Sequence, residues 1–268
     1  MANTASARIA DLKPGDGYVQ SFARGLEVIR SFSAKAPSQT LTEVAGRAGL
    51  SRAGARRILL TLEALGYVRS DGKLFSLSPR ILDLGFSYLS SMPIWNLAEP
   101  VMEALVAQVH ESSSAAVLDG TDIVYVLRVP TRKIMSISLG VGSRLPAYCT
   151  SMGRILLSAL AQDDLMALLR ASDLAARTKT TLTDAKEIAA KVAQARRQGW
   201  SLVNQELEEG LISLAAPIVD RSGQMVAALN ISGQANRTSA RVMQDTMLEP
   251  LLEAARTISR QLDGTTVA

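Results

Sequence analysis

The chain has few of the residues on which metal sites and many active sites depend. Its 268 residues include one cysteine, Cys149, and one histidine, His110. A single cysteine excludes an intrachain disulfide, and these two residues alone cannot supply a clustered zinc site. The sequence also lacks a P-loop and the G-x-G-x-x-G pattern of dinucleotide-binding proteins. We therefore expect that the protein is not an enzyme and that it binds no metal and no cofactor. His110 is expected to have a structural role.

Long apolar runs and targeting signals are also missing. No apolar run approaches the ~20 residues that a membrane span needs. The N-terminus does not show the basic-then-apolar order of a secretory signal, so we expect a cytoplasmic protein without membrane contact. Residues 1–18 hold Ala, Ser, Thr, Gly and Pro with little periodicity, and we expect a mobile arm there. The length and a hydrophobic content of 47% predict two packed domains.

The most informative segment is LTEVAGRAGLSRAGARRILLTLEALGYV, residues 41–68. Gly49 can take the left-handed backbone that ends one helix, and Ser51 is a good N-cap for the next. Arg52, Arg56 and Arg57 fall on the exposed side of this second helix. Its other face carries apolar residues at spacings of three and four, which are Ala55, Ile58, Leu59, Leu62 and Leu65. The pattern predicts a helix-turn-helix that enters a DNA major groove; the alternative is a surface helical hairpin with solvated charges.

The flanking segments complete a winged helix. Two strand-like runs, 67–69 and 74–77, surround Asp71-Gly72, which is a strong hairpin signal. Residues 20–32 predict a first helix, followed by a loop at 33–40. We expect its buried side to carry Phe22, Leu26, Ile29 and Phe32. The charge agrees with DNA binding: residues 1–78 carry a net +5, with eleven Lys and Arg against six Asp and Glu, whereas residues 79–268 carry −1, with eighteen against nineteen.

On this pattern we expect two sets of DNA contacts. The groove-facing set is Ser51, Arg52, Ala53, Gly54, Arg56 and Arg57. The phosphate-binding set is Ser21, Arg24 and Lys73, the last at the tip of the wing.

A linker helix is predicted next, over residues 79–92. Ser78 is an N-cap, and Pro79 occupies the first helical position. Apolar residues lie on every side of this helix, and they are Leu82, Leu84, Phe86, Tyr88 and Leu89. Such a helix must be buried, either against the following domain or against the same helix of a second subunit.

Residues 93–264 predict an α+β domain. Helices are expected at about 99–108, 151–160, 163–169, 184–199 and 240–262, and strands at 115–118, 123–129, 134–139, 201–204, 212–219 and 225–231. Three strands, then helices, then three more strands predict an antiparallel sheet covered by helices. A DNA-binding architectural protein without a ligand would not need a second domain of ~170 residues.

Several segments resemble the IclR family of regulators. RLPAYCTSMGRILL at 144–157, and QELEEGL at 205–211 with the paired strands that end at Asn230-Ile231-Ser232-Gly233, resemble its effector domain. The resemblance covers 18–262. The segments 19–26, 77–86 and 146–153 resemble the Pca/Pob-type branch, which controls aromatic-acid catabolism through the β-ketoadipate pathway.

The resemblance implies an operator-binding regulator with a winged helix-turn-helix at 19–78, the linker helix at 79–92 and a GAF-like effector-binding domain at 93–264. It implies homodimers formed through the N-terminal domain and linker helix, which often pair into tetramers. In this branch the effectors are small carboxylates such as p-hydroxybenzoate, protocatechuate or β-ketoadipate. The alternative is an IclR-type regulator that controls another carbon-source pathway. The sign of regulation, the operator and the exact effector stay open.

The expected effector site centres on a helix that Thr150 or Ser151 begins, with Met152 and Gly153 in its first turn. Free N–H groups and the helix dipole favour a carboxylate there, and Gly153 lets a ligand approach the backbone. The family resemblance adds Ser213 and Asn230, on the later strands.

Other candidates have two interpretations each. Glu206 either accepts a ligand hydroxyl or is a solvated loop charge. Arg128 and Arg144 are candidate carboxylate partners, although a surface salt bridge is favoured for Arg144. Tyr148 either stacks on an aromatic ring or only packs. Cys149 precedes a helix N-terminus, which lowers a thiol pKa and suggests a redox sensor, but free cysteines are usually buried and inert.

Overall fold

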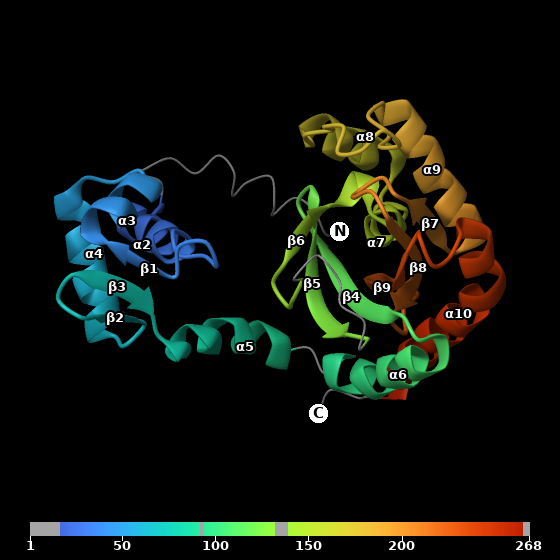
Figure 1. The fold of residues 1–268 in the computed structure, drawn as a ribbon, viewed down its shortest axis with the longest axis horizontal. Helices are drawn as coiled ribbons and strands as arrows, with labels where there is room; N and C mark the ends of the chain where they lie inside the picture. The colour runs from blue at the N-terminus through green and yellow to red at the C-terminus, as the bar shows by residue number, and fades with distance from the viewer. Residues whose placement is uncertain (1–16, 92–93, 132–138, 265–268) are drawn as a thin grey trace. The chain divides into compact units, whose positions relative to one another are not determined.

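The computed structural model describes residues 17–91, 94–131 and 139–264. The chain divides into two compact units, Met1–Ser91 and Met92–Ala268, and each is described by itself (Figure 1). Nearly all of the predicted arm, and most of the strand predicted at 134–139, lie outside the described residues.

The first unit is a winged helix-turn-helix followed by a helix. It contains α2 (Gln20–Arg30), β1 (Ser38–Thr40), α3 (Leu41–Arg47), α4 (Arg52–Ala64), β2 (Val68–Ser70), β3 (Leu74–Leu77), η1 (Pro79–Ile81) and α5 (Leu82–Ser90). The three strands form an antiparallel sheet in the order β1-β3-β2. The predicted helices and hairpin are confirmed. The sequence missed β1, because three polar residues become a strand only when β3 supplies the hydrogen bonds.

Local signals set the turn between α3 and α4. Thr40 and Glu43 form a reciprocal capping box at the start of α3. Gly49 has a φ of +63°, the left-handed conformation predicted for it. The hydroxyl of Ser51 accepts a hydrogen bond from the Gly54 amide at 3.2 Å, which caps α4 as predicted.

The core of the first unit is small, and it corrects one prediction. Val28 from α2 is fully buried with Val44 from α3 and Leu59 from α4. Phe22 is 69% exposed and Leu26 is 37% exposed, so the prediction that both are buried is wrong. The cause is that the core takes Val28 from the C-terminal part of α2 and Phe32 from just after the helix. The face that carries Phe22 and Leu26 looks outward.

The helix after the wing is present, but its apolar residues are not buried by the described part of this chain. Ser78 accepts a hydrogen bond from the Arg80 amide and caps η1, with Pro79 at the first position as predicted. In α5, Leu82 and Phe86 are 70% and 68% exposed, and Leu84 and Tyr88 on the other side are also exposed. This helix therefore presents apolar surface on more than one side.

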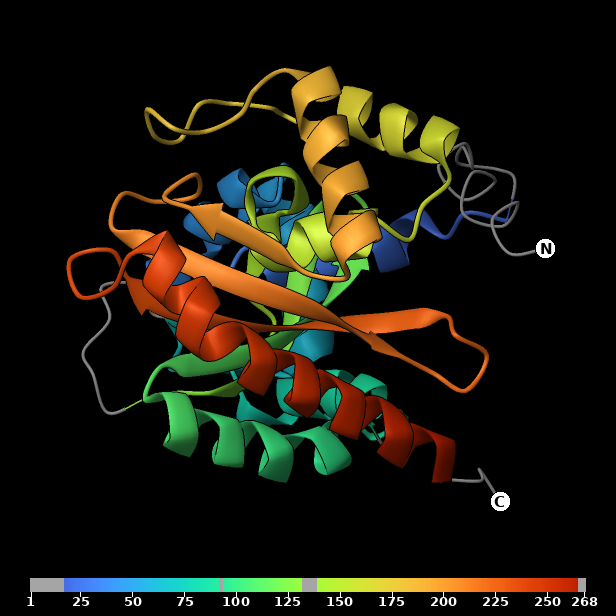
Figure 2. The same ribbon diagram turned by 90° about the vertical axis from the view of Figure 1, so that its right-hand side faces the viewer.

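The second unit is a six-stranded antiparallel sheet with helices on both faces. Its elements are α6 (Ile94–Val109), β4 (Ser112–Asp119), β5 (Asp122–Val129), β6 (Arg144–Pro146), η2 (Ala147–Cys149), α7 (Ser151–Leu157), α8 (Gln162–Ala171), α9 (Ala185–Gln198), β7 (Ser201–Asn204), β8 (Leu211–Val219), β9 (Met225–Gln234) and α10 (Ala240–Gly264). The strand order is β6-β5-β4-β9-β8-β7. Figure 2 shows α6 and α10 on one face and α7, α8 and α9 on the other. The predicted α+β class is confirmed.

Helix α7 positions the site described below. All seven of its residues are buried, and it packs on β4, β8 and β9 with α9 on its outer side. Because α7 is surrounded by protein, its first turn opens into the interior rather than into solvent. Within the described ranges, no helix is long and apolar enough to cross a membrane.

Candidate functional site

The first candidate surface is the exposed face of α4. Arg52, Ala53, Arg56 and Arg57 are exposed, Gly54 is half-buried, and Ala55, Leu59 and Leu62 are buried on the opposite face. The guanidinium groups of Arg52, Arg56 and Arg57 make no ion pair within the described part of the chain. A helix with an apolar back and three unpaired arginines on its front suits entry into a DNA groove.

The wing adds a lysine to the exposed cations of the first unit. Lys73 is exposed in the turn between β2 and β3. Asp71 closes this turn: one carboxylate oxygen accepts from the amides of Leu74 at 2.7 Å and Lys73 at 2.9 Å. These hydrogen bonds, first that of Leu74, hold the pKa of Asp71 below its usual value. Ser21 and Arg24 are exposed near the start of α2.

The second candidate site is a buried cavity in the second unit, between α7 and the sheet. It unites five of the predicted residues, Thr150, Ser151, Met152, Ser213 and Asn230. The sequence reasoning missed the other residues of its lining. They are Tyr125, Cys149, Val203, Leu207, Leu211 and Ser232.

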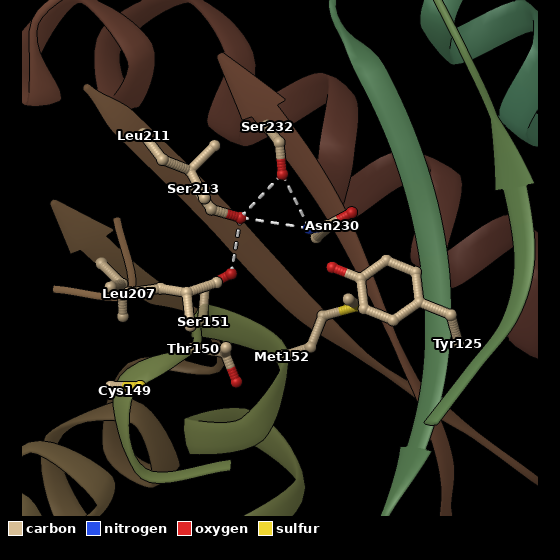
Figure 3. Close-up of a pocket in the computed structure, with 11 residues that line it drawn as sticks. Tyr125, Cys149, Thr150, Ser151, Met152, Leu207, Leu211, Ser213, Asn230 and Ser232 are labelled. Atoms are coloured by element: carbon tan, nitrogen blue, oxygen red, sulfur yellow. Dashed lines mark hydrogen bonds between the residues drawn. The ribbon is translucent and has the colours of Figure 1, made fainter. Parts of the chain in front are cut away.

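A hydrogen-bonded cluster forms the polar wall of this cavity (Figure 3). The Ser213 hydroxyl lies 2.7 Å from that of Ser151 and 3.2 Å from that of Ser232. The Asn230 amide group donates to Ser213 at 3.1 Å and to Ser232 at 2.9 Å. The Ser114 backbone amide donates to the Asn230 side-chain oxygen at 2.9 Å, which fixes the NH₂ group towards the hydroxyls. Rotatable hydroxyl protons let this wall donate to a ligand oxygen or accept from a ligand hydroxyl.

Tyr125 of β5 forms another part of the wall. Its phenol points towards the hydroxyl cluster in Figure 3. Burial raises its pKa to about 12, so the phenol is neutral at physiological pH. It can therefore donate its O–H to an anionic ligand oxygen.

The cavity is small. The volume open to the centre of a water-sized sphere is about 20 Å³. That is room for roughly one or two waters, well below the ~300 Å³ at which ligand pockets begin. An aromatic acid fits only if part of the wall moves.

The first turn of α7 differs in one respect from the prediction. Thr150 is the N-cap, and its hydroxyl accepts from the Gly153 amide at 3.2 Å. Gly153 does not line the cavity, and a side chain there would collide with the backbone of Ala147. The glycine is therefore needed because η2 packs against α7, which is not the reason that the sequence suggested.

Glu206 is a buried charge rather than a solvated one. It is 8% exposed and does not line this cavity. Its carboxylate accepts from the Arg154 guanidinium at 2.5 Å and from the Leu182 amide at 3.3 Å. Its interpretation as a solvated loop charge is therefore wrong: it is half of a buried ion pair that joins α7 to the loop before β8.

Three other candidates lie outside the cavity wall. Arg144 bridges Asp119 at 2.7 Å and Asp122 at 3.2 Å on the surface, as the salt-bridge interpretation predicted. Tyr148 packs: it is 1% exposed, and its hydroxyl donates to the Ala175 carbonyl at 2.6 Å. Arg128 is half-buried near the end of β5 and does not line the cavity.

The chemistry of Cys149 argues against a reactive thiol. Burial raises its pKa to about 11, so the thiol stays protonated at neutral pH, although it precedes a helix N-terminus.

His110 ends α6 in a left-handed conformation with a φ of +56°. No group of three or more His, Cys, Asp or Glu is placed to hold a metal ion in the ranges that the structure describes.

One of the missed residues left a signal in the sequence. Ser232 is two residues after Asn230 on β9 and pairs with Ser213 of β8, so all three side chains share a face. Strand alternation applied to Asn230 would have found it. Tyr125 left no such signal, because only the sheet order brings β5 near α7.

Comparisons with known proteins agree with this architecture. Residues 21–72 match the IclR helix-turn-helix domain, and residues 86–260 match the C-terminal domain of the bacterial transcriptional regulator IclR. A Pca regulon regulatory protein of Pseudomonas putida is 45% identical over 248 residues, which are 92% of this chain and 85% of that protein. The p-hydroxybenzoate hydroxylase transcriptional activator of Acinetobacter baylyi is 34% identical over 242 residues, 88% of this chain and 89% of that protein.

A solved structure has the same fold. It is an IclR homologue from Microbacterium hydrocarbonoxydans complexed with 4-hydroxybenzoate, with a TM-score of 0.81 and 24% identity, covering 91% of this chain and 100% of that one. The two named relatives are of the Pca and p-hydroxybenzoate types, the branch that the sequence motifs indicated. The chain belongs to the IclR family of bacterial transcriptional regulators.

Proposed function

We propose that this protein regulates genes of aromatic-compound catabolism, in the β-ketoadipate or protocatechuate pathway, and that a small carboxylate effector controls it from the cytoplasm. The observation that best supports this proposal is that one chain combines a helix with an exposed arginine face and, in a separate unit, a buried cavity lined by hydroxyl groups. The 45% identity to a Pca regulon regulatory protein supports the pathway. We propose no catalytic role and no metal or other cofactor.

In this proposal α4 contacts bases and the residues around it contact phosphates. Ser51, Arg52, Ala53, Gly54, Arg56 and Arg57 face the groove, and Ser21, Arg24 and Lys73 bind phosphate. The support is the exposure of Arg52, Arg56 and Arg57 on one face, opposite the buried residues of α4.

The effector occupies the cavity beneath α7. Thr150, Ser151, Met152, Ser213 and Asn230 contact it, together with Tyr125 and Ser232. No lysine or arginine lines this cavity in the described ranges, so hydroxyls, the Asn230 amide and the first-turn amides of α7 hold the carboxylate. Arg128, Tyr148, Gly153 and Glu206, which the sequence also suggested, do not line this cavity, and in this proposal they do not contact the effector.

Binding requires the wall to move, and the loop before β8 is the part we expect to move. This loop carries Leu207 into the cavity wall and is held from outside by Thr178, whose hydroxyl donates to the Gln205 carbonyl at 2.6 Å. Effector control requires that the ligand bind two conformations with different affinity. We propose that these conformations differ in the orientation of the DNA-binding domains, and that α5 carries the change.

We propose that the protein is a homodimer whose dimers can pair. The support is the apolar surface of the first unit on α2 and α5, where Phe22 and Phe86 are both more than two-thirds exposed. Phe86→Asp should shift the sedimenting species to monomer at micromolar concentration. Ser222→Asp, in an exposed turn of the second unit, is the control, and a monomeric wild-type protein would disprove the dimer.

Calorimetry tests the effector assignment. The full-length protein would be titrated with p-hydroxybenzoate, protocatechuate and β-ketoadipate. We expect one of them to bind, and Ser213→Ala or Asn230→Ala to weaken it about tenfold, since one buried hydrogen bond contributes ~1–2 kcal/mol. Ser222→Ala is the control. No heat with any of the three at millimolar concentration would remove the pathway assignment and leave the family standing.

DNA binding is tested with a duplex that the wild-type protein selects from a random library. Arg56→Ala should cost ~1–3 kcal/mol if Arg56 reads a base, whereas Arg170→Ala on α8 should cost nothing. An unchanged affinity for Arg56→Ala would remove it from that role.

A further inference from the structure

A second cavity lies in the effector unit, on the outer side of β7. It is lined by residues of α7, α9, β7 and the first turn of α10. By the same measure as the cavity beneath α7, its volume is about 470 Å³, and it is open to solvent. This is within the ~300–1,000 Å³ range of small-molecule sites.

The charges of this cavity favour an anion. Arg154, Lys191 and Arg241 line it against one carboxylate, that of Glu206, which leaves a net charge of +2. Lys191 makes no ion pair among the described residues, and Arg241 has only an exposed contact of 3.6 Å with Asp245. The N-terminus of the 25-residue helix α10 lies at the same place, and its dipole adds positive potential.

A buried and unsatisfied donor strengthens this inference. The Arg154 side chain is 2% exposed, and its Nε has no hydrogen-bond acceptor, although its terminal nitrogen binds Glu206. Leaving a buried polar group unpaired costs about 1–3 kcal/mol. Such a group is uncommon in native proteins and marks a place where a ligand acceptor is favourable.

The rest of the wall suits an organic anion better than a bare ion. Gln194, Gln198, Asn204 and Gln244 supply amide donors and acceptors, and Trp200 supplies an aromatic ring. Such a wall recognises a carboxylate or phosphate that carries hydroxyl groups.

The two cavities are separate: α7 and β7 contribute residues to both, but no residue lines both. On β7, Val203 lines the cavity beneath α7, whereas Ser201, Leu202 and Asn204 line the outer one. Trp200 lines only the outer cavity, and no tryptophan lines the inner one. A signal from Trp200 therefore reports on the outer cavity.

We propose that the outer cavity is a second ligand site, for a small organic anion, with Arg154, Lys191 and Arg241 as its anion-binding groups. This site is distinct from the proposed effector cavity and does not depend on the effector's identity.

Tryptophan fluorescence tests this site directly. The sequence has two tryptophans, Trp95 and Trp200, so the full-length Trp95→Phe variant reports on Trp200 alone. It would be titrated with gluconate, succinate and inorganic phosphate at constant ionic strength. We expect a saturable change with at least one carboxylate below ~10 mM, and a weaker response to succinate than to gluconate, which also carries hydroxyls. Saturation with phosphate alone would identify a phosphate site and overturn the preference for an organic anion.

Two surface substitutions separate specific binding from a general charge effect. Lys191→Ala with Arg241→Ala, added to the reporter variant, should weaken binding at least tenfold, and both residues are exposed enough for the fold to be kept. Lys186→Ala, on the same helix but outside the cavity, should leave the affinity unchanged. Absence of saturation with all three probes, or equal affinity in the double variant and the control, would overturn the proposal.

Discussion

Replacing Glu206 with alanine removes the counter-charge of a guanidinium that is 2% exposed. The pair spans 52 positions of sequence and joins α7 to the loop before β8. Removing one partner of a buried ion pair costs ~3–5 kcal/mol, because the remaining charge stays buried without compensation. We expect this loss in the free energy of unfolding of the second unit for Glu206→Ala, and a similar loss for Arg154→Ala.

The chain contains a matched control. Arg144 also pairs with two carboxylates, but its side chain is 47% exposed. Exposed pairs contribute ~0–1 kcal/mol, so Arg144→Ala should be almost neutral. The double variant Arg154→Met with Glu206→Leu, which removes both charges and keeps the volume, should lose less than either alanine variant.

Urea unfolding followed by tryptophan fluorescence measures these differences. Trp95 and Trp200 both lie in the second unit, so their emission reports on that unit alone. Protein concentration is held constant because association stabilises the folded state. A loss below about 1 kcal/mol for Glu206→Ala, no larger than that for Arg144→Ala, would refute the reasoning and show that water screens the pair.

Three further outcomes are expected. Burial raises the pKa of Cys149 from 9 to about 11, so the stability that the protonated thiol contributes is complete below pH 9 and is lost as the pH rises to 11. At ~1.4 kcal/mol per pKa unit the loss is about 2–3 kcal/mol, and the difference in unfolding free energy between wild type and Cys149→Ala should shrink by that amount between pH 8 and pH 11. Gly153→Ala should destabilise the second unit by about 1–3 kcal/mol or more, because the new Cβ meets the Ala147 backbone, whereas Gly140→Ala meets no atom; equal melting temperatures would contradict this. Lys73→Ala should reduce the salt dependence of DNA binding by about one counterion, and an unchanged slope in a plot of log affinity against log salt would exclude a phosphate contact.

Local sequence signals predicted the helices with the best accuracy where caps were present. Asp184 and Gly199 mark the two ends of α9, and both act within one turn of the helix. The same holds for Ser51 and α4. The sequence missed β1 and β6, each of three residues, because such short strands exist only through pairing with a partner strand.

Only the part of the site that lies in one local segment, or that the family resemblance supplied, was predicted from the sequence. Thr150, Ser151 and Met152 form one local segment that opens α7, and the family resemblance added Ser213 and Asn230. Tyr125 and Leu207 reach the cavity from β5 and from the loop before β8, and no local pattern relates either to α7.

The sequence by itself determined the helix-turn-helix, the wing, the basic first unit and the α+β class of the second, because periodicity, caps and turn residues act over a few positions. The tertiary structure alone decided which apolar and charged residues are buried. Phe22 has the spacing of a core residue, yet it is exposed because Val28 and Phe32 contribute the α2 side of the core. Glu206 has the setting of a loop charge, yet it is buried because Arg154 lies beside it in space. Burial depends on neighbours distant in sequence, which a local pattern does not contain.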